Sequence, residues 1–180
     1  MSISDQLYSL TEWLRTTPVV DLALWVSRQP LSLVMGTKFL TIPLLQTIHI
    51  VSIATAFGAV LMMNLRVLGV AGAGRPLSWS TRRYVPWVWG ALLALLLTGS
   101  GLVIAEPVRE LVNPIFWIKM TLIVALILLS LGFQAALGRF GERWEDISGG
   151  PVAARIGAVS LLLLWCGVIV AGRWIAYAPT

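Results

Sequence analysis

The stretch LLQTIHIVSIATAFGAVLMMNLRVLG, residues 44–69, decides the fold. It carries no charged side chain before Arg66. As a helix rising 1.5 Å per residue, that uncharged part is long enough to cross a hydrocarbon core of about 30 Å. We therefore predict a transmembrane helix over residues 39–63. The same stretch holds the only histidine of the chain, His49, and so raises the question of what a lone imidazole does inside a membrane.

The composition agrees with a membrane protein. Of the 180 residues, 58% are hydrophobic and 12% are charged, and the mean hydropathy is +0.86. Soluble domains are about 45–50% apolar and about 25% charged. The net charge of +5 is the excess that arginines on cytoplasmic loops give a membrane protein. We expect no nucleic acid partner, because no soluble basic domain is available to bind one.

Three further segments are long and apolar enough to span a bilayer. Asn113 and Pro114 supply a start signal for one of them, an N-cap followed by proline at the first helical position. The fold class that we predict is all-α, an integral membrane four-helix bundle over residues 37–180. Its spans are 39–63, 85–105, 114–137 and 156–177.

The first 36 residues are predicted to form one or two short amphipathic helices that lie in the membrane interface. Leu7, Leu10 and Leu14 recur at helical spacing, with charged residues on the other faces. The segment PVVDLALWVSRQ begins a second helix at Pro18, which stops before Pro30. Neither piece is long enough to span, so we treat residues 1–36 as a separate interfacial segment.

The arginines predict the orientation in the membrane. The loop 64–84 contains no acidic residue, and the loop before the fourth span is also rich in arginine. Because positively charged loops stay on the cytoplasmic side, these two loops are predicted to be cytoplasmic. Both termini then face outward, to the periplasm if the protein lies in a bacterial inner membrane. The arginines in question are Arg66, Arg75, Arg82, Arg83, Arg139, Arg143 and Arg155.

Five polar residues are predicted to share one depth, in the outer part of the bilayer. Counting about 1.5 Å per residue from the outer end of each span places them there, although four different helices contribute them. We expect an outward-facing polar pocket in which Glu106 pairs with Arg173 or Lys119. In the alternative, Lys119 and Arg173 reach the lipid headgroups through their long apolar stems. The five residues are Gln46, His49, Glu106, Lys119 and Arg173.

His49 is open to three interpretations. It is a neutral histidine hydrogen-bonded within the bundle, an axial ligand of a haem b iron, or a contact for a quinone or a proton relay. The chain has no second histidine, so bis-histidine ligation of haem within one chain is excluded. A haem would need Met120, another weak ligand, an open position, or a histidine from a partner.

Three motifs carry a resemblance to a known family. QTIHIVSIATAFGAVLMMNLRVLG, NPIFWIKM and WCGVIVAGRWIAY resemble an uncharacterised family of small bacterial four-helix inner-membrane proteins, and more distantly the membrane domain of copper-resistance D proteins. The resemblance implies a fold and a membrane location but no reaction. Its motifs point to His49, Asn64, Arg66, Lys119 and Arg173. Asn64 stands where relatives have Asp, and the scattered Met, His and Cys residues do not suit copper.

Three functions remain open. The first is a non-catalytic accessory or anchor subunit of a larger bacterial membrane complex, in contact with lipid and with a protein partner or a second copy. The second is a redox subunit that binds haem b or a quinone near His49 for electron transfer. The third, a small transporter, lacks visible repeats and broken helices. No catalytic constellation is visible, so we expect no enzyme activity from the chain alone.

Overall fold

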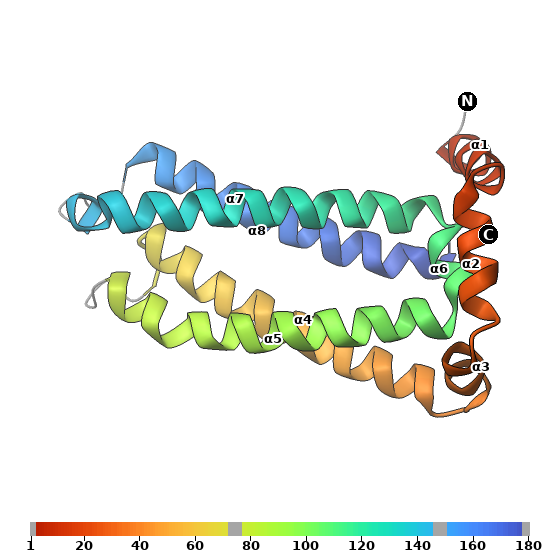
Figure 1. Cartoon of the computed structure of the whole chain (residues 1–180). Helices are drawn as coiled ribbons and strands as arrows, with labels where there is room; N and C mark the ends of the chain where they lie inside the picture. Colours follow the sequence, from red (N-terminus) through yellow and green to blue (C-terminus); the bar gives the residue numbers. More distant parts are fainter. Residues whose placement is uncertain (1–2, 72–76, 146–150, 178–180) are drawn as a thin grey trace. The chain divides into compact units, whose positions relative to one another are not determined.

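The protein is built on four long apolar helices. The computed structural model describes residues 3–71, 77–145 and 151–177, and this part of the chain is helical with no strand. Figure 1 shows the long helices, which are α4 (Thr41–Val67), α5 (Leu77–Ala105), α7 (Pro114–Glu145) and α8 (Val152–Trp174). Each contains a stretch long and apolar enough to cross a bilayer. The chain is therefore an all-α, multi-pass membrane protein.

Two of the long helices extend beyond the predicted membrane spans. The predicted second span ends at residue 105, as α5 does, and the predicted third span begins at residue 114, as α7 does. However, α5 begins at Leu77 rather than at 85 and continues through Pro86. Likewise, α7 runs on to Glu145. Hydrophobicity predicts only the part of a helix that lies in the membrane, whereas backbone hydrogen bonds extend a helix beyond it.

Short helices accompany the long ones. They are α1 (Ile3–Arg15), α2 (Pro18–Ser27), α3 (Pro30–Thr37), α6 (Pro107–Leu111) and the 3₁₀ turn η1 (Ile175–Tyr177). The sequence predicted one or two N-terminal helices, whereas the structure has three. Pro30 was taken only as a stop, but it also occupies the first position of α3. Proline suits that position because its missing N–H needs no partner there.

The chain divides into two compact units. Unit 1 comprises residues 1–51, 94–121 and 169–180, and unit 2 comprises residues 52–93 and 122–168. Each unit contains a segment of each long helix, and unit 1 also contains α1, α2, α3 and α6. The sequence analysis separated residues 1–36 from residues 37–180 because the first segment is amphipathic, whereas the two units are defined by compactness. The division at residue 36 stays a prediction.

The core of unit 2 is made of small and aromatic side chains. Ala158 is fully buried in a cluster with Val67 and Ala154. The ring of Phe133 packs against this cluster. A Cβ atom at Gly157 would lie 3.0 Å from the Phe133 ring, so these two helices approach closely. Trp165 is buried, and its ring centroid lies 6.3 Å from that of Phe57. Trp165 therefore serves packing, as its position in mid-span suggests.

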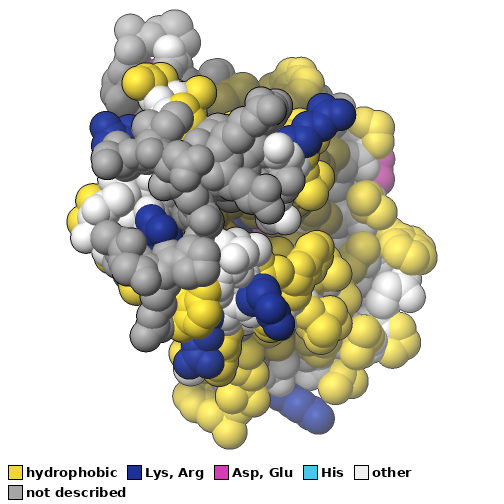
Figure 2. Space-filling model, turned by 90° about the vertical axis from the view of Figure 1, so that its left-hand side faces the viewer, with side chains coloured by type: hydrophobic (Ala, Val, Ile, Leu, Met, Phe, Trp, Pro, Cys, Tyr) yellow, Lys and Arg dark blue, Asp and Glu magenta, His cyan; other side chains and the backbone are white. Residues whose placement is uncertain are grey.

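Unit 2 also carries the arginines that predicted the orientation. Five arginines of the two positively charged loops and the adjoining helix ends lie in unit 2: Arg66, Arg82, Arg83, Arg139 and Arg155. Figure 2 shows a face on which Lys and Arg side chains are prominent and few Asp or Glu side chains are visible. Such a face is typical of the cytoplasmic side of a membrane protein.

Candidate polar site in unit 1

His49 makes one short hydrogen bond, and this bond defines its protonation. Its Nδ1 lies 2.7 Å from the Thr98 hydroxyl oxygen on α5. The Thr98 hydroxyl in turn donates to the Ala94 carbonyl oxygen at 2.6 Å. A hydroxyl has a single proton, so when Thr98 donates its proton to Ala94, its oxygen is left to accept a hydrogen bond from His49. This arrangement favours the tautomer with the proton on Nδ1.

The other ring nitrogen of His49 is left open. Among the described residues, Nε2 has no hydrogen-bond partner. Every fully buried side-chain nitrogen or oxygen in the described part of the chain does have a partner. Nε2 is thus accessible at the surface of unit 1. A charged imidazolium without an acceptor would be costly inside a membrane, so the ring is neutral and Nε2 offers a lone pair.

The small residues of α5 let this helix approach α4 closely at the level of His49. A Cβ atom at Gly99 would lie 3.4 Å from the Cε1 atom of His49, and one at Gly101 would lie 3.1 Å from a methyl group of Leu45. Side chains of α4 therefore already occupy the space that these two glycines provide.

Lys119 is the second polar group of the site. It extends from α7, is half-buried, and packs against α8, where a Cβ atom at Gly172 would lie 3.9 Å from its Cε atom. Lys119 is close enough to interact electrostatically with His49 and with Glu110. The described residues provide its ammonium group with no hydrogen bond or ion pair. The site therefore combines an open acceptor, Nε2 of His49, with an open donor, the side-chain nitrogen of Lys119.

Glu110 borders this site from α6, outside the membrane spans. Burial raises the pKa of its carboxyl group, and the neighbouring Glu106 acts in the same direction, while Lys119 and Arg109 oppose the shift. The sequence analysis counted this loop only for its charge and did not single out Glu110. The signal available was an acidic residue three positions before the Asn113 cap.

Three of the five predicted site residues do not bond to His49 or Lys119. Glu106 pairs with Arg109 at 2.6 Å, so its predicted pairing with Arg173 or Lys119 is wrong. An arginine one turn away reaches the carboxylate without crossing to another helix. Arg173 is exposed and donates to the Tyr177 hydroxyl at 2.8 Å. Gln46, although one turn from His49, is also exposed.

Asn113 fixes the helix that carries Lys119. Its Oδ1 accepts a hydrogen bond from the Ile115 backbone N–H at 2.9 Å, which confirms the predicted N-cap of α7. Its Nδ2 donates to the Ile175 carbonyl oxygen at 3.0 Å, and the side chain is fully buried. The second bond, which the sequence did not predict, ties the start of α7 to the end of α8.

Asn64 and Arg66, which the resemblance also singled out, lie at the end of α4 in unit 2. Asn64 is buried. These two residues do not belong to the site around His49.

Comparison with known protein families places the chain in one of them. The model of a family of unknown function, DUF6644, matches residues 32–178. A comparison with curated proteins and one with solved structures gave no match. The expectation of an uncharacterised family is confirmed, whereas the bacterial origin and the likeness to copper-resistance D proteins stay predictions.

Proposed function

Since the chain belongs to the DUF6644 family, whose function is unknown, we propose a function from the site itself: a membrane subunit that binds a quinone or quinol at His49 and Lys119. The observation that carries this proposal is the accessible, unpaired Nε2 atom of a neutral histidine within a membrane span. Such a group is costly in lipid and is a functional candidate by default.

The two open groups suit the two oxygens of this ligand class. A quinol hydroxyl can donate a hydrogen bond to Nε2 of His49, and the Lys119 ammonium group can donate to a quinone carbonyl oxygen. Thr98 holds the imidazole in the tautomer that leaves Nε2 free. A quinone is also apolar enough to reach a site that opens within the bilayer.

Haem b is the less favoured ligand. The tautomer of His49 suits one axial bond to iron. However, the chain supplies no second histidine, and side chains of α4 occupy the space beside Gly99 and Gly101. A visible spectrum of the purified protein separates the two ligands: a Soret band that disappears in His49→Ala would support haem and contradict the quinone.

Gln46 supports an accessory role in a larger assembly. It lies within the span Thr41–Val67, its side chain is exposed, and the described residues give its amide no partner. An unsatisfied amide in hydrocarbon is unfavourable, and glutamine side chains hydrogen-bond across helices in membranes. We infer that a partner subunit or a second copy of this chain covers Gln46.

The proposed location follows from the arginines of unit 2. We place their face in the cytoplasm of a bacterium and both termini in the periplasm, because positive loops remain inside. The site around His49 would then lie in the periplasmic half of the cytoplasmic membrane.

Calorimetric titration of the full chain in nanodiscs with decylubiquinol tests the quinone proposal. His49→Leu is expected to bind decylubiquinol about fivefold more weakly, because a lost hydrogen bond is worth about 1 kcal/mol. Lys119→Met is expected to weaken the binding of decylubiquinone by a similar factor. Ile48→Leu, the adjacent exposed position, is the matched control. Binding by His49→Leu as tight as by the control would refute the proposal.

A further inference from the structure

A groove lies in unit 1 on a part of the surface that does not include His49 or Lys119. It has a volume of about 450 Å³, and α1, the start of α2 and the start of α7 line it. This volume is within the range of small-ligand sites, about 300–1,000 Å³. The function proposed above does not involve this groove.

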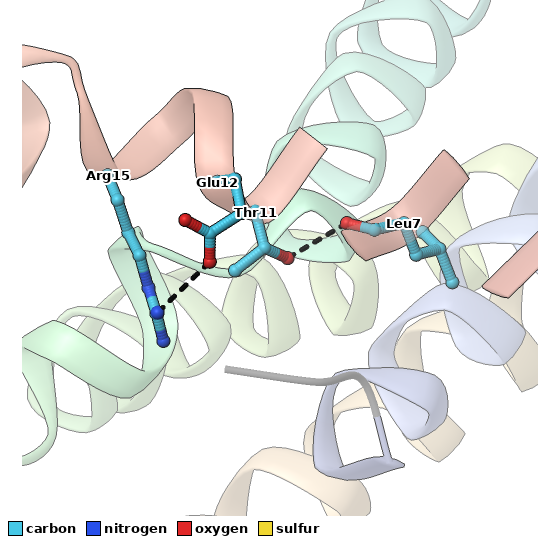
Figure 3. Close-up of polar contacts among 4 residues, drawn as sticks. All are labelled: Leu7, Thr11, Glu12 and Arg15. Carbon is cyan, nitrogen blue, oxygen red and sulfur yellow. Dashed lines mark hydrogen bonds and ion pairs between the residues drawn. The ribbon is translucent and has the colours of Figure 1, made fainter. Parts of the chain in front are cut away.

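One wall of the groove is the apolar stripe of α1. Leu10, Trp13 and Leu14 line it and recur at helical spacing. The charged side chains of α1 lie elsewhere on the helix, where Glu12 and Arg15 form an ion pair at 3.1 Å. Figure 3 shows this pair, together with the hydroxyl of Thr11, which bonds to the Leu7 carbonyl oxygen. The charged groups of Glu12 and Arg15 and the hydroxyl of Thr11 are therefore already bonded within the helix.

The opposite wall is the first two turns of α7. Trp117, Ile118 and Thr121 line it, and all three are exposed. Because α7 spans the membrane from Pro114, this wall is continuous with the lipid-facing surface of a transmembrane helix. At 1.5 Å per residue, it reaches about 10 Å into the bilayer.

Most polar atoms on the groove lining are already satisfied. The Thr17 hydroxyl donates to the Leu14 carbonyl oxygen, the Thr121 hydroxyl donates to the Trp117 carbonyl oxygen, and the Trp117 indole N–H donates to the Leu111 carbonyl oxygen. The lining thus offers these groups to no ligand, and it suits a hydrocarbon chain. One donor remains: the Trp13 indole N–H has no partner among the described residues. Tryptophan at this level commonly meets lipid headgroups.

We propose that this groove is a specific site for one bilayer phospholipid, with an acyl chain between α1 and α7 and an ester carbonyl oxygen accepting from Trp13. A phospholipid is favoured over a partner's transmembrane helix because such a helix would run along the whole span of about 30 Å, whereas the groove ends after two turns of α7. The bound lipid fastens the interfacial helix α1 to the start of α7.

Native mass spectrometry of the full chain released from gently delipidated micelles tests this site. The wild type is expected to retain one phospholipid that resists further detergent washing. Thr121→Trp fills the groove and is expected to lose that lipid. Met120 immediately precedes Thr121 on α7 and does not line the groove, so Met120→Trp is expected to keep the lipid. Leu10→Trp, which blocks the other wall, and Leu24→Trp, which does not, form a second matched pair.

Equal lipid retention by Thr121→Trp and Met120→Trp in folded, monodisperse samples would overturn the proposal. So would a lipid-free dimer in the wild type, because a second copy would then occupy the groove. Decylubiquinol binding should be unchanged in Thr121→Trp, so this site and the one at His49 succeed or fail separately.

Discussion

His49 owes its chemistry to a residue that the sequence did not single out, Thr98. The sequence predicted His49 and Lys119 as site residues, because ionisable groups within a span are rare and costly. Depth along a helix can be counted from the sequence, but the direction in which a side chain leaves the helix toward its neighbours cannot. For this reason Gln46 and Arg173, at suitable depths, are exposed in the structure.

Thr98→Val should destabilise the protein and weaken ligand binding. The substitution keeps the shape of the side chain but removes the acceptor for Nδ1–H, and an unsatisfied buried donor costs about 1–3 kcal/mol. Unfolding in a denaturing detergent measures the loss. Thr98→Ser keeps the hydroxyl and serves as the control. If both variants unfold alike, the hydrogen bond between Thr98 and His49 is unimportant.

Glu110→Gln should stabilise the protein above the usual carboxyl pKa and have little effect below it. Burial raises the pKa of Glu110 in the folded state, so the fold favours the protonated form. The stability that this group contributes is present at low pH and is lost as the pH rises above 4.5 through the raised pKa. Glutamine stays neutral throughout and avoids that loss.

Thermal unfolding of Glu110→Gln and of the wild type at pH 4 and at pH 8 checks this. The Tm of Glu110→Gln should be higher than that of the wild type at pH 8, and this difference should shrink at pH 4. A difference in Tm that is the same at both pH values would show that the effect does not arise from ionisation of Glu110.

At the scale of elements, proline and asparagine mark the helix starts that the sequence predicted well. Pro18 and Pro114 each occupy the first turn of a helix, and Asn113 caps α7 as predicted. Local chemistry determines these features, so a short stretch of sequence is enough to predict them. The bond from Asn113 to Ile175 joins residues far apart in the chain, and no local pattern reveals it.

Asn113→Asp and Asn113→Ala separate the two bonds of Asn113. Aspartate keeps the N-cap acceptor but removes the donor to Ile175, whereas alanine removes both. The cap is worth about 1 kcal/mol, and a hydrogen bond such as that to Ile175 is worth about 1 kcal/mol more. We expect both variants to be less stable than the wild type in a detergent-unfolding titration, and aspartate to be the more destabilising, because its buried carboxylate faces the Ile175 carbonyl oxygen. Equal stability of the alanine variant and the wild type would contradict this account of α7 and α8.

Gly157 and Gly132 should respond oppositely to a larger side chain. A Cβ atom at Gly157 would meet the Phe133 ring at 3.0 Å, whereas one at Gly132 would meet nothing within 4 Å. Gly157→Leu is therefore expected to cost about 1–3 kcal/mol by overpacking. Gly132→Leu should be neutral or slightly stabilising, since leucine favours helix. Unfolding curves of both variants test this, and a stable Gly157→Leu variant would show that α8 is not closely packed there.

For the whole molecule, composition was enough to predict a four-span membrane protein, because each span must shield its own backbone and present apolar side chains. Composition could not reveal the two compact units, which cut across the long helices and depend on packing between segments far apart in sequence. It also could not predict α3, whose eight residues carry no amphipathic pattern long enough to recognise.

Topology can be tested with single cysteines. In a Cys166→Ser background, Ser9→Cys in α1 and Ser78→Cys in α5 place one thiol at each predicted side, and both serines are exposed. In intact bacterial cells, a membrane-impermeant maleimide should label position 9 and spare position 78. The reverse pattern would place the arginine face outside and the His49 site in the cytoplasmic half of the membrane.

The most direct test of the central claim uses the fact that the chain has a single histidine. With ¹⁵N-histidine incorporated into the full chain, nitrogen NMR in nanodiscs reports one imidazole and both of its nitrogens. We predict a protonated Nδ1, an unprotonated Nε2, and a shift of the Nε2 resonance alone when decylubiquinol is added. A proton on Nε2, or an Nε2 resonance that does not respond to saturating decylubiquinol, would contradict the account.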